Sequence, residues 1–260
     1  MTVAVGQGGL AGWRLLQRTG DRQMQMLSRD AQIGRERDRF VQARDSYGSA
    51  EAIVGDYQTL KVALTAFGLE ADLPNKAFIR KVLESDLSDP KSLVNRLSDK
   101  RYRTFAEAFG LGPGGVRPSA ETVASRVGAL FIEREYERRV GEADPNLRLA
   151  LNAKRELGLL ASRSSSENTK WFEILGNPPL RSVLEGALGL PRDSARMPID
   201  AQAALFKDMA ERRFGSDFFS RLQDPATLGK VIDSFLARSA LAGSGGSRPY
   251  NVALAILGVA

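Results

Sequence analysis

The chain has 260 residues, 43% of them hydrophobic and 26% charged, and it contains neither histidine nor cysteine. These proportions are typical of a globular protein and exclude wholesale disorder, while the missing residue types exclude disulfides, zinc sites built from Cys or His, cysteine nucleophiles and histidine-based triads. Lys and Arg (37) exceed Asp and Glu (31) only slightly, so the net charge of +6 and the mixed signs disfavour a nucleic-acid-binding surface.

The first nine residues are rich in glycine, and we expect them to be mobile. Residues 2–5 followed by Gly6-Gln7-Gly8-Gly9-Leu10-Ala11 match the strand and GxGxxA loop of a dinucleotide site. No second strand follows that would complete a βαβ unit. We therefore expect no cofactor at this loop.

Residues 10–45 carry apolar side chains at helical spacing among many Arg and Gln residues, which predicts one or two amphipathic helices. We expect residues 1–48 to form an N-terminal arm. Trp13, Leu15 and Leu16 lie on this arm, and no core partner for Trp13 is evident. These three residues are candidate contacts with a protein partner, and the alternative for Trp13 is an ordinary core position.

A series of short helices with clear start and end signals follows. Ala-Phe-Gly-Leu occurs at 66–69 and again at 108–111, with looser copies at 156–159 and 187–190. Each glycine follows an apolar helical pattern and is expected to end a helix, with positive φ at Gly68, Gly110 and Gly189. Asp-Pro at 89–90, 144–145 and 224–225 is the complementary start signal, in which the carboxylate caps the helix and proline occupies the first turn.

These signals predict an all-α fold, a multi-helix bundle of short, glycine-capped helices in which strands are nearly absent. Apolar stripes place the helices near residues 53–57, 60–67, 78–83, 93–97, 102–109, 119–136, 145–160, 170–175, 178–188, 199–214 and 225–241. The serine-rich stretch 162–168 is the best interior linker candidate. We expect a first helical half at 49–162, a second at 167–242, and a spacer with an apolar tail at 243–260, although the halves could pack as one domain.

The two halves share a longer pattern. TLKVALTAFGL (59–69) resembles LRSVLEGALGL (180–190), and LSDPKSLVNRL (87–97) resembles LQDPATLGKVI (222–232), in the same order along the chain. The ordered pair of matches favours two related halves that arose by duplication. The alternative is that similar helix caps arose independently.

Charged clusters offer little chemistry. The run Glu133–Arg139 predicts a solvated helix face with i,i+4 ion pairs, and Lys100-Arg101-Tyr102-Arg103 is too short to indicate a nucleic-acid patch. Asp86 and Asp89 fit a loop and a cap better than a metal site or an acid–base pair. An enzyme would have to rely on Asp, Glu, Lys, Tyr or Ser alone, and we expect no catalytic, cofactor-binding or metal-binding residues.

The apolar run 252–260 is too short to span a membrane, and the first twelve residues lack the pattern of a secretory signal, so we expect a cytoplasmic protein. Leu254, Ile256 and Leu257 in this run are further candidate contacts with a protein partner. Apolar segments at the ends of a helical core are suited to docking in a groove of another protein.

Four stretches together resemble a known family. They are LAGWRLLQRT (10–19), AFGLEADLPNKAFIRKVLESDLSDPKSLVNRLSDKRY (66–102), NTKWFEILGNPPLRSVLEGALGLP (168–191) and YNVALAILG (250–258). They are similar to an alphaproteobacterial domain of unknown function that is often encoded among flagellar genes and sometimes labelled a flagellar protein. The resemblance implies an all-helical protein linked to flagellar assembly or function, and it implies no catalytic residues.

These observations favour a non-catalytic structural or protein-interaction protein, whose partner the resemblance would place among flagellar components. The alternatives are a helical regulator that binds nucleic acid and, less favoured, an enzyme that uses only Asp, Glu, Lys or Tyr.

Overall fold

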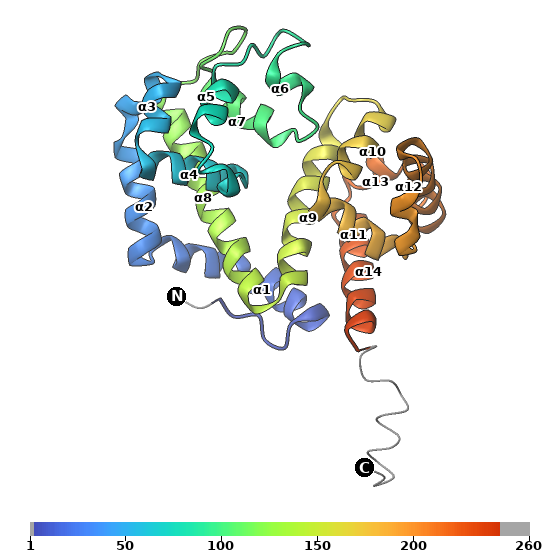
Figure 1. The fold of residues 1–260 in the computed structure, drawn as a ribbon. Coiled ribbons are helices and arrows are strands. Elements are labelled where there is room, and N and C mark those ends of the chain that lie inside the picture. Colours follow the sequence, from blue (N-terminus) through green and yellow to red (C-terminus); the bar gives the residue numbers. More distant parts are fainter. Residues whose placement is uncertain (1–2, 245–260) are drawn as a thin grey trace, which may run out of the picture. The chain divides into compact units, whose positions relative to one another are not determined.

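The computed structural model describes residues 3–244, and the regular secondary structure of this part is entirely helical, with fourteen α-helices and three short 3-10 helices (Figure 1). The predicted all-α, multi-helix fold is thereby confirmed. Within the same residues, none of the helices has the length and apolar character needed to cross a membrane.

The described chain forms two compact units with bounds that differ from the predicted halves. Unit 1 contains residues 3–4 and 18–139, and unit 2 contains residues 5–17 and 140–244. The helix expected to close the first half belongs instead to unit 2, because α9 (Pro145–Ser162) packs against α11 (Pro178–Leu188) and α14 (Pro225–Ser244). The predicted arm is likewise divided, since residues 5–17 belong to unit 2.

Unit 1 is built around α4 (Tyr57–Phe67), which is buried along most of its length and packs against neighbouring helices. A chain of ring contacts continues this core: Phe40 stacks on Tyr47 at 5.0 Å between centroids, and Phe105 contacts Phe67 at 5.4 Å and Phe109 at 5.3 Å. The remaining helices of the unit are the second part of α1 (Gly9–Ser28), α2 (Ala31–Gln42), η1 (Arg44–Gly48), α3 (Ala50–Gly55), η2 (Glu70–Asp72), α5 (Lys76–Leu83), α6 (Leu93–Arg96), α7 (Arg101–Phe109) and most of α8 (Ala120–Ala143).

Unit 2 contains the helices α9, α11 and α14, which pack against one another (Figure 1). A second core of this unit is centred on Trp171. The Trp171 ring stacks on Phe218 at 5.5 Å and contacts Phe219 at 4.9 Å and Phe206 at 6.4 Å. The other helices of the unit are α10 (Glu167–Leu175), η3 (Arg192–Arg196), α12 (Ile199–Phe214) and α13 (Phe218–Arg221). The four-residue helix α13 was not predicted.

The glycines that end helices behave as predicted at three of four positions. Gly68, Gly110 and Gly189 have φ of 69°, 59° and 73°, each directly after a helix. The expectation for Gly158 is wrong, because this glycine lies inside α9, which continues to Ser162. The residues after Gly158 include the buried Leu160 and Ala161, so the apolar pattern carries the helix past the glycine.

The Asp-Pro start signals are confirmed at two positions. Asp144 accepts hydrogen bonds from the backbone N–H groups of residues 146 and 147 at the start of α9, and Asp224 accepts from residues 226 and 227 at the start of α14. Asp89 instead caps a turn, accepting from the N–H of Lys91 at 2.9 Å, and α6 begins only at Leu93.

The beginning of the described chain is packed, which corrects the expectation of a mobile start. Val3 and Val5 are buried, and the Gln23 side chain both accepts from the N–H of Ala4 and donates to its carbonyl at 2.9 and 3.0 Å. The glycine loop at residues 6–9 is held at the start of α9, because the N–H of Gly9 donates to the Asp144 carboxylate at 2.8 Å.

The charged run 133–139 on α8 is not the solvated face that its composition predicts. Glu135, Tyr136 and Glu137 are all buried. Two ion pairs of the run have i,i+3 spacing, with Arg134 to Glu137 at 3.1 Å and Arg138 to Glu135 at 2.8 Å. The Arg134 guanidinium also donates to the carbonyl of Ala66 at the end of α4, so this run holds helices together inside unit 1.

Candidate functional site

The carboxylates whose pKa is shifted serve the backbone and its turns. Hydrogen bonds from the N–H of Thr59, from the Ser88 hydroxyl and from the N–H of Ala226 lower the pKa of Asp56, Asp86 and Asp224, respectively. A lowered pKa keeps a carboxylate ionised at neutral pH, whereas a general acid needs a raised one. Within residues 3–244, no group of three or more acidic side chains is placed to hold a metal ion.

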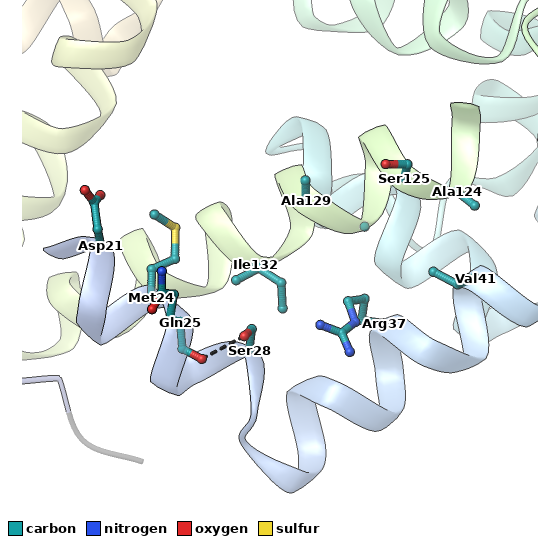
Figure 2. Close-up of a pocket in the computed structure, with 11 residues that line it drawn as sticks. Asp21, Met24, Gln25, Ser28, Arg37, Val41, Ala124, Ser125, Ala129 and Ile132 are labelled. Carbon is teal, nitrogen blue, oxygen red and sulfur yellow. Dashed lines mark hydrogen bonds between the residues drawn. The ribbon is translucent and has the colours of Figure 1, made fainter. Parts of the chain in front are cut away.

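A groove in unit 1 is the candidate site (Figure 2). It has a volume of about 560 Å³ and lies where α1, α2 and α8 meet. The groove is defined as the space lined by Asp21, Met24, Gln25 and Ser28 from α1, Arg37 and Val41 from α2, and Ala124, Ser125, Gly128, Ala129 and Ile132 from α8.

Helical periodicity explains why these side chains share one space. The four lining positions of α1 are spaced i, i+3, i+4 and i+7, and the two positions of α2 are spaced i and i+4, so each set occupies one helix face. The turn between the two helices is held by Asp30, whose carboxylate accepts from the N–H groups of Gln32 and Ile33. Both faces are thereby directed toward α8.

Small residues on α8 leave the space open. Ala124, Gly128 and Ile132, spaced i, i+4 and i+8, are buried and form the floor, while Ser125 and Ala129 are exposed on its side. A Cβ added at Gly128 would lie 3.5 Å from the Arg37 side chain, an ordinary van der Waals contact. Figure 2 shows Ile132 pointing from α8 toward α1 and α2, with Arg37 reaching into the same space.

The chemistry of the groove is mainly apolar. Its charged lining residues are Asp21 and Arg37, and Arg37 already forms an ion pair with Asp38 at 2.7 Å. The volume falls within the range of ligand-binding pockets. A space between three helices, with an apolar floor and small flanking residues, is suited to receive an apolar helix from a partner.

The residues that sequence reasoning singled out as partner contacts do not line this groove. Trp13 is 1% exposed and Leu16 is 4% exposed, so the expectation that the arm presents them to a partner is wrong for these two side chains. Leu15 is half-buried. Leu254, Ile256 and Leu257 lie outside the described residues. Sequence reasoning missed the groove, although the small residues at 124, 125, 128 and 129 are visible as a helical stripe.

Tyr136, one turn beyond Ile132 on α8, provides a test of packing in unit 1. Burial and the nearby Asp21 carboxylate raise the pKa of Tyr136 to about 12, and its hydroxyl has no hydrogen-bond partner among the described residues. We expect Tyr136→Phe to leave the free energy of unfolding at neutral pH unchanged or to raise it by up to about 1 kcal/mol, because an unsatisfied buried hydroxyl is removed.

The same substitution has a pH signature. An unfolded tyrosine loses its proton near pH 10, before the folded one, so Tyr136 contributes stability that is present below about pH 10 and is lost by about pH 12. The Tyr136→Phe variant should therefore lose less stability than the wild type over this range. Urea unfolding at neutral pH and near pH 11 measures both effects. A clear loss of stability at neutral pH would show that the hydroxyl has a stabilising partner.

Comparisons with known proteins match this chain to a family and to a solved structure. A family described as "Protein of unknown function (DUF1217)" matches residues 66–228. The X-ray crystal structure of a protein from Agrobacterium tumefaciens is similar, with a TM-score of 0.70 and 27% sequence identity over 87% of this chain and 90% of that one. A comparison with curated proteins finds no match.

Proposed function

We propose that this chain, which belongs to the DUF1217 family of proteins of unknown function, is a non-catalytic interaction protein that binds an apolar helical segment of a protein partner in the groove. The observation that carries the proposal is the groove itself: an apolar floor on α8, flanked by small residues and bordered by exposed side chains. The carboxylates with a lowered pKa belong to caps and turns, so they offer no competing acid–base site.

The proposed partner is a flagellar component. This part of the proposal is supported by the resemblance of residues 10–19, 66–102, 168–191 and 250–258 to a family that is often encoded among flagellar genes. The mixed charges favour a protein over a nucleic acid, because basic side chains are taken up in ion pairs, as in Arg101 with Asp99 and Arg103 with Glu107.

A single charge in the groove should abolish this binding. Ala129 is exposed on the side of the groove, and Ala129→Glu would place a carboxylate against the apolar segment of the partner. We expect the dissociation constant to rise at least about tenfold. The partner would be recovered with the wild-type chain from its native cells, identified, purified and titrated against both chains.

Ala77→Glu is the matched control, because Ala77 is an exposed alanine of α5 in the same unit and lies outside the groove. It changes the charge equally and should leave the affinity unaltered. If Ala129→Glu and Ala77→Glu bind the purified partner equally well, the groove is not the binding site. Tight, salt-sensitive binding of DNA by the wild-type chain would contradict the proposed function as a whole.

A further inference from the structure

The groove is bordered by arginines that the fold leaves without ion pairs. Arg18 and Arg22 are exposed on α1, seven and three positions before Gln25 of the lining, so all three lie on one side of the helix. Arg126 is exposed on α8, three positions before Ala129 of the lining. None of the three arginines takes part in an ion pair within residues 3–244. Together they form a basic rim on the α1 and α8 sides of the groove.

The carboxylates near the basic rim do not balance its charge. Asp38 and Glu121 are already paired with Arg37 and Arg44. Asp21 is the one carboxylate of the lining, and it forms no ion pair among the described residues. Three guanidinium groups therefore stand against one such carboxylate, so the surface that borders the apolar floor is positive. A ligand with carboxylates beside its apolar face would complement this surface.

We propose that the segment of the partner that binds in the groove is an acidic amphipathic helix, with large apolar side chains along one stripe and Glu or Asp on the flanks of that stripe. The inference rests on the proposed function, in that the groove must accept an apolar helix. The small residues of α8 leave room for large side chains on the ligand, and the basic rim borders that space. Because the rim is exposed, its charges act mainly by attracting the ligand, and salt screens this attraction.

Three synthetic peptides of about 20 residues test this charge preference on the full chain. They share one leucine stripe with i, i+3, i+4 and i+7 spacing, and they carry Glu, Gln or Lys at the positions that flank it. At about 0.1 M salt we expect the Glu peptide to bind at least about fivefold more tightly than the Gln peptide, and the Lys peptide to bind most weakly. At about 1 M salt the Glu and Gln peptides should differ by less than about twofold. If the Glu peptide binds no more tightly than the Gln peptide, or if neither binds, the proposal is wrong.

Removal of charge from the basic rim should abolish the preference. In the double variant Arg22→Gln with Arg126→Gln, the affinity for the Glu peptide should fall to within about twofold of the affinity for the Gln peptide. Lys76→Gln with Arg96→Gln is the matched control, because both side chains are exposed in unit 1, lie outside the groove lining and form no ion pair within residues 3–244. The control should weaken binding of the Glu peptide by less than about twofold at about 0.1 M salt. An equal loss in both double variants would overturn the proposal, since the net charge of the chain would then explain the preference.

The purified partner separates this inference from the proposed function. If Ala129→Glu abolishes its binding while Arg22→Gln with Arg126→Gln leaves its affinity unchanged at about 0.1 M salt, the inference is wrong and the proposed function stands. An anionic membrane surface is the other ligand that a basic rim could attract. Binding of the wild-type chain to vesicles of phosphatidylserine and phosphatidylcholine, without binding of the Glu peptide, would assign the rim to a membrane and overturn the proposal.

Discussion

Truncation of Trp13 to alanine is expected to lower the free energy of unfolding by about 3–5 kcal/mol, the usual loss for a fully buried tryptophan. Trp13 is 1% exposed, and its helical turn is anchored within unit 2. The backbone of Gly12 packs so tightly that a Cβ there would lie 2.6 Å from the carbonyl oxygen of Val5 and 2.9 Å from Leu147 at the start of α9. The site has little freedom to collapse around the missing ring. Urea unfolding and hydrogen exchange of α9 amides would measure the loss.

The matched control is Arg14→Ala in the same turn. Arg14 forms an ion pair with Asp233 at 2.6 Å, but its side chain is 56% exposed, so its removal should lower the free energy of unfolding by at most about 1 kcal/mol.

Deletion of residues 1–20 should destabilise the chain, as Trp13→Ala does, because it removes Val3, Val5, Trp13 and Leu16 from the interior. If Trp13→Ala is as stable as Arg14→Ala yet loses the partner, Trp13 is a contact residue after all.

Gly112→Ala is expected to be the most damaging glycine substitution in unit 1, with a loss of about 3 kcal/mol or more. A Cβ at this position would lie 2.0 Å from the carbonyl oxygen and 2.7 Å from the carbonyl carbon of Ser85. Both atoms belong to the backbone, so no side-chain rotation can relieve the clash. The adjoining hydrogen bond from the N–H of Leu87 to the carbonyl of Pro113, at 3.0 Å, holds the two loops together and should be lost with it.

Gly158→Ala is the matched control and should have the opposite sign. Gly158 lies inside α9, and no atom beyond the local helix lies within 4 Å of a Cβ built there. Alanine in a helix interior is favoured over glycine by about 1 kcal/mol, so this variant should be more stable than the wild type. The midpoints of thermal unfolding of both variants measure this difference. Similar midpoints would contradict the prediction that a Cβ at residue 112 clashes with the backbone of Ser85.

Local signals predicted the candidate groove only in part. The helices that line it were expected from the apolar stripes in residues 10–45 and 119–136, and the small residues that open it on α8 are present in the sequence. What placed the faces of α1 and α2 against those small residues is the turn at Asp30 and the packing of unit 1. The predicted partner contacts were large apolar side chains such as Trp13, whereas small residues on α8 open the groove.

The sequence by itself determined where most helices begin and end, because a cap such as Asp144 or a left-handed glycine such as Gly189 acts on backbone groups within one turn of itself. Only the tertiary structure decided which helices share a unit and which charges are buried. The local pattern predicts that Glu135 and Glu137 are solvated, yet they lie in the interior paired with arginines on their own helix. Whether a side chain is buried depends on which residues distant in the chain pack against it, and the local sequence pattern does not contain this information.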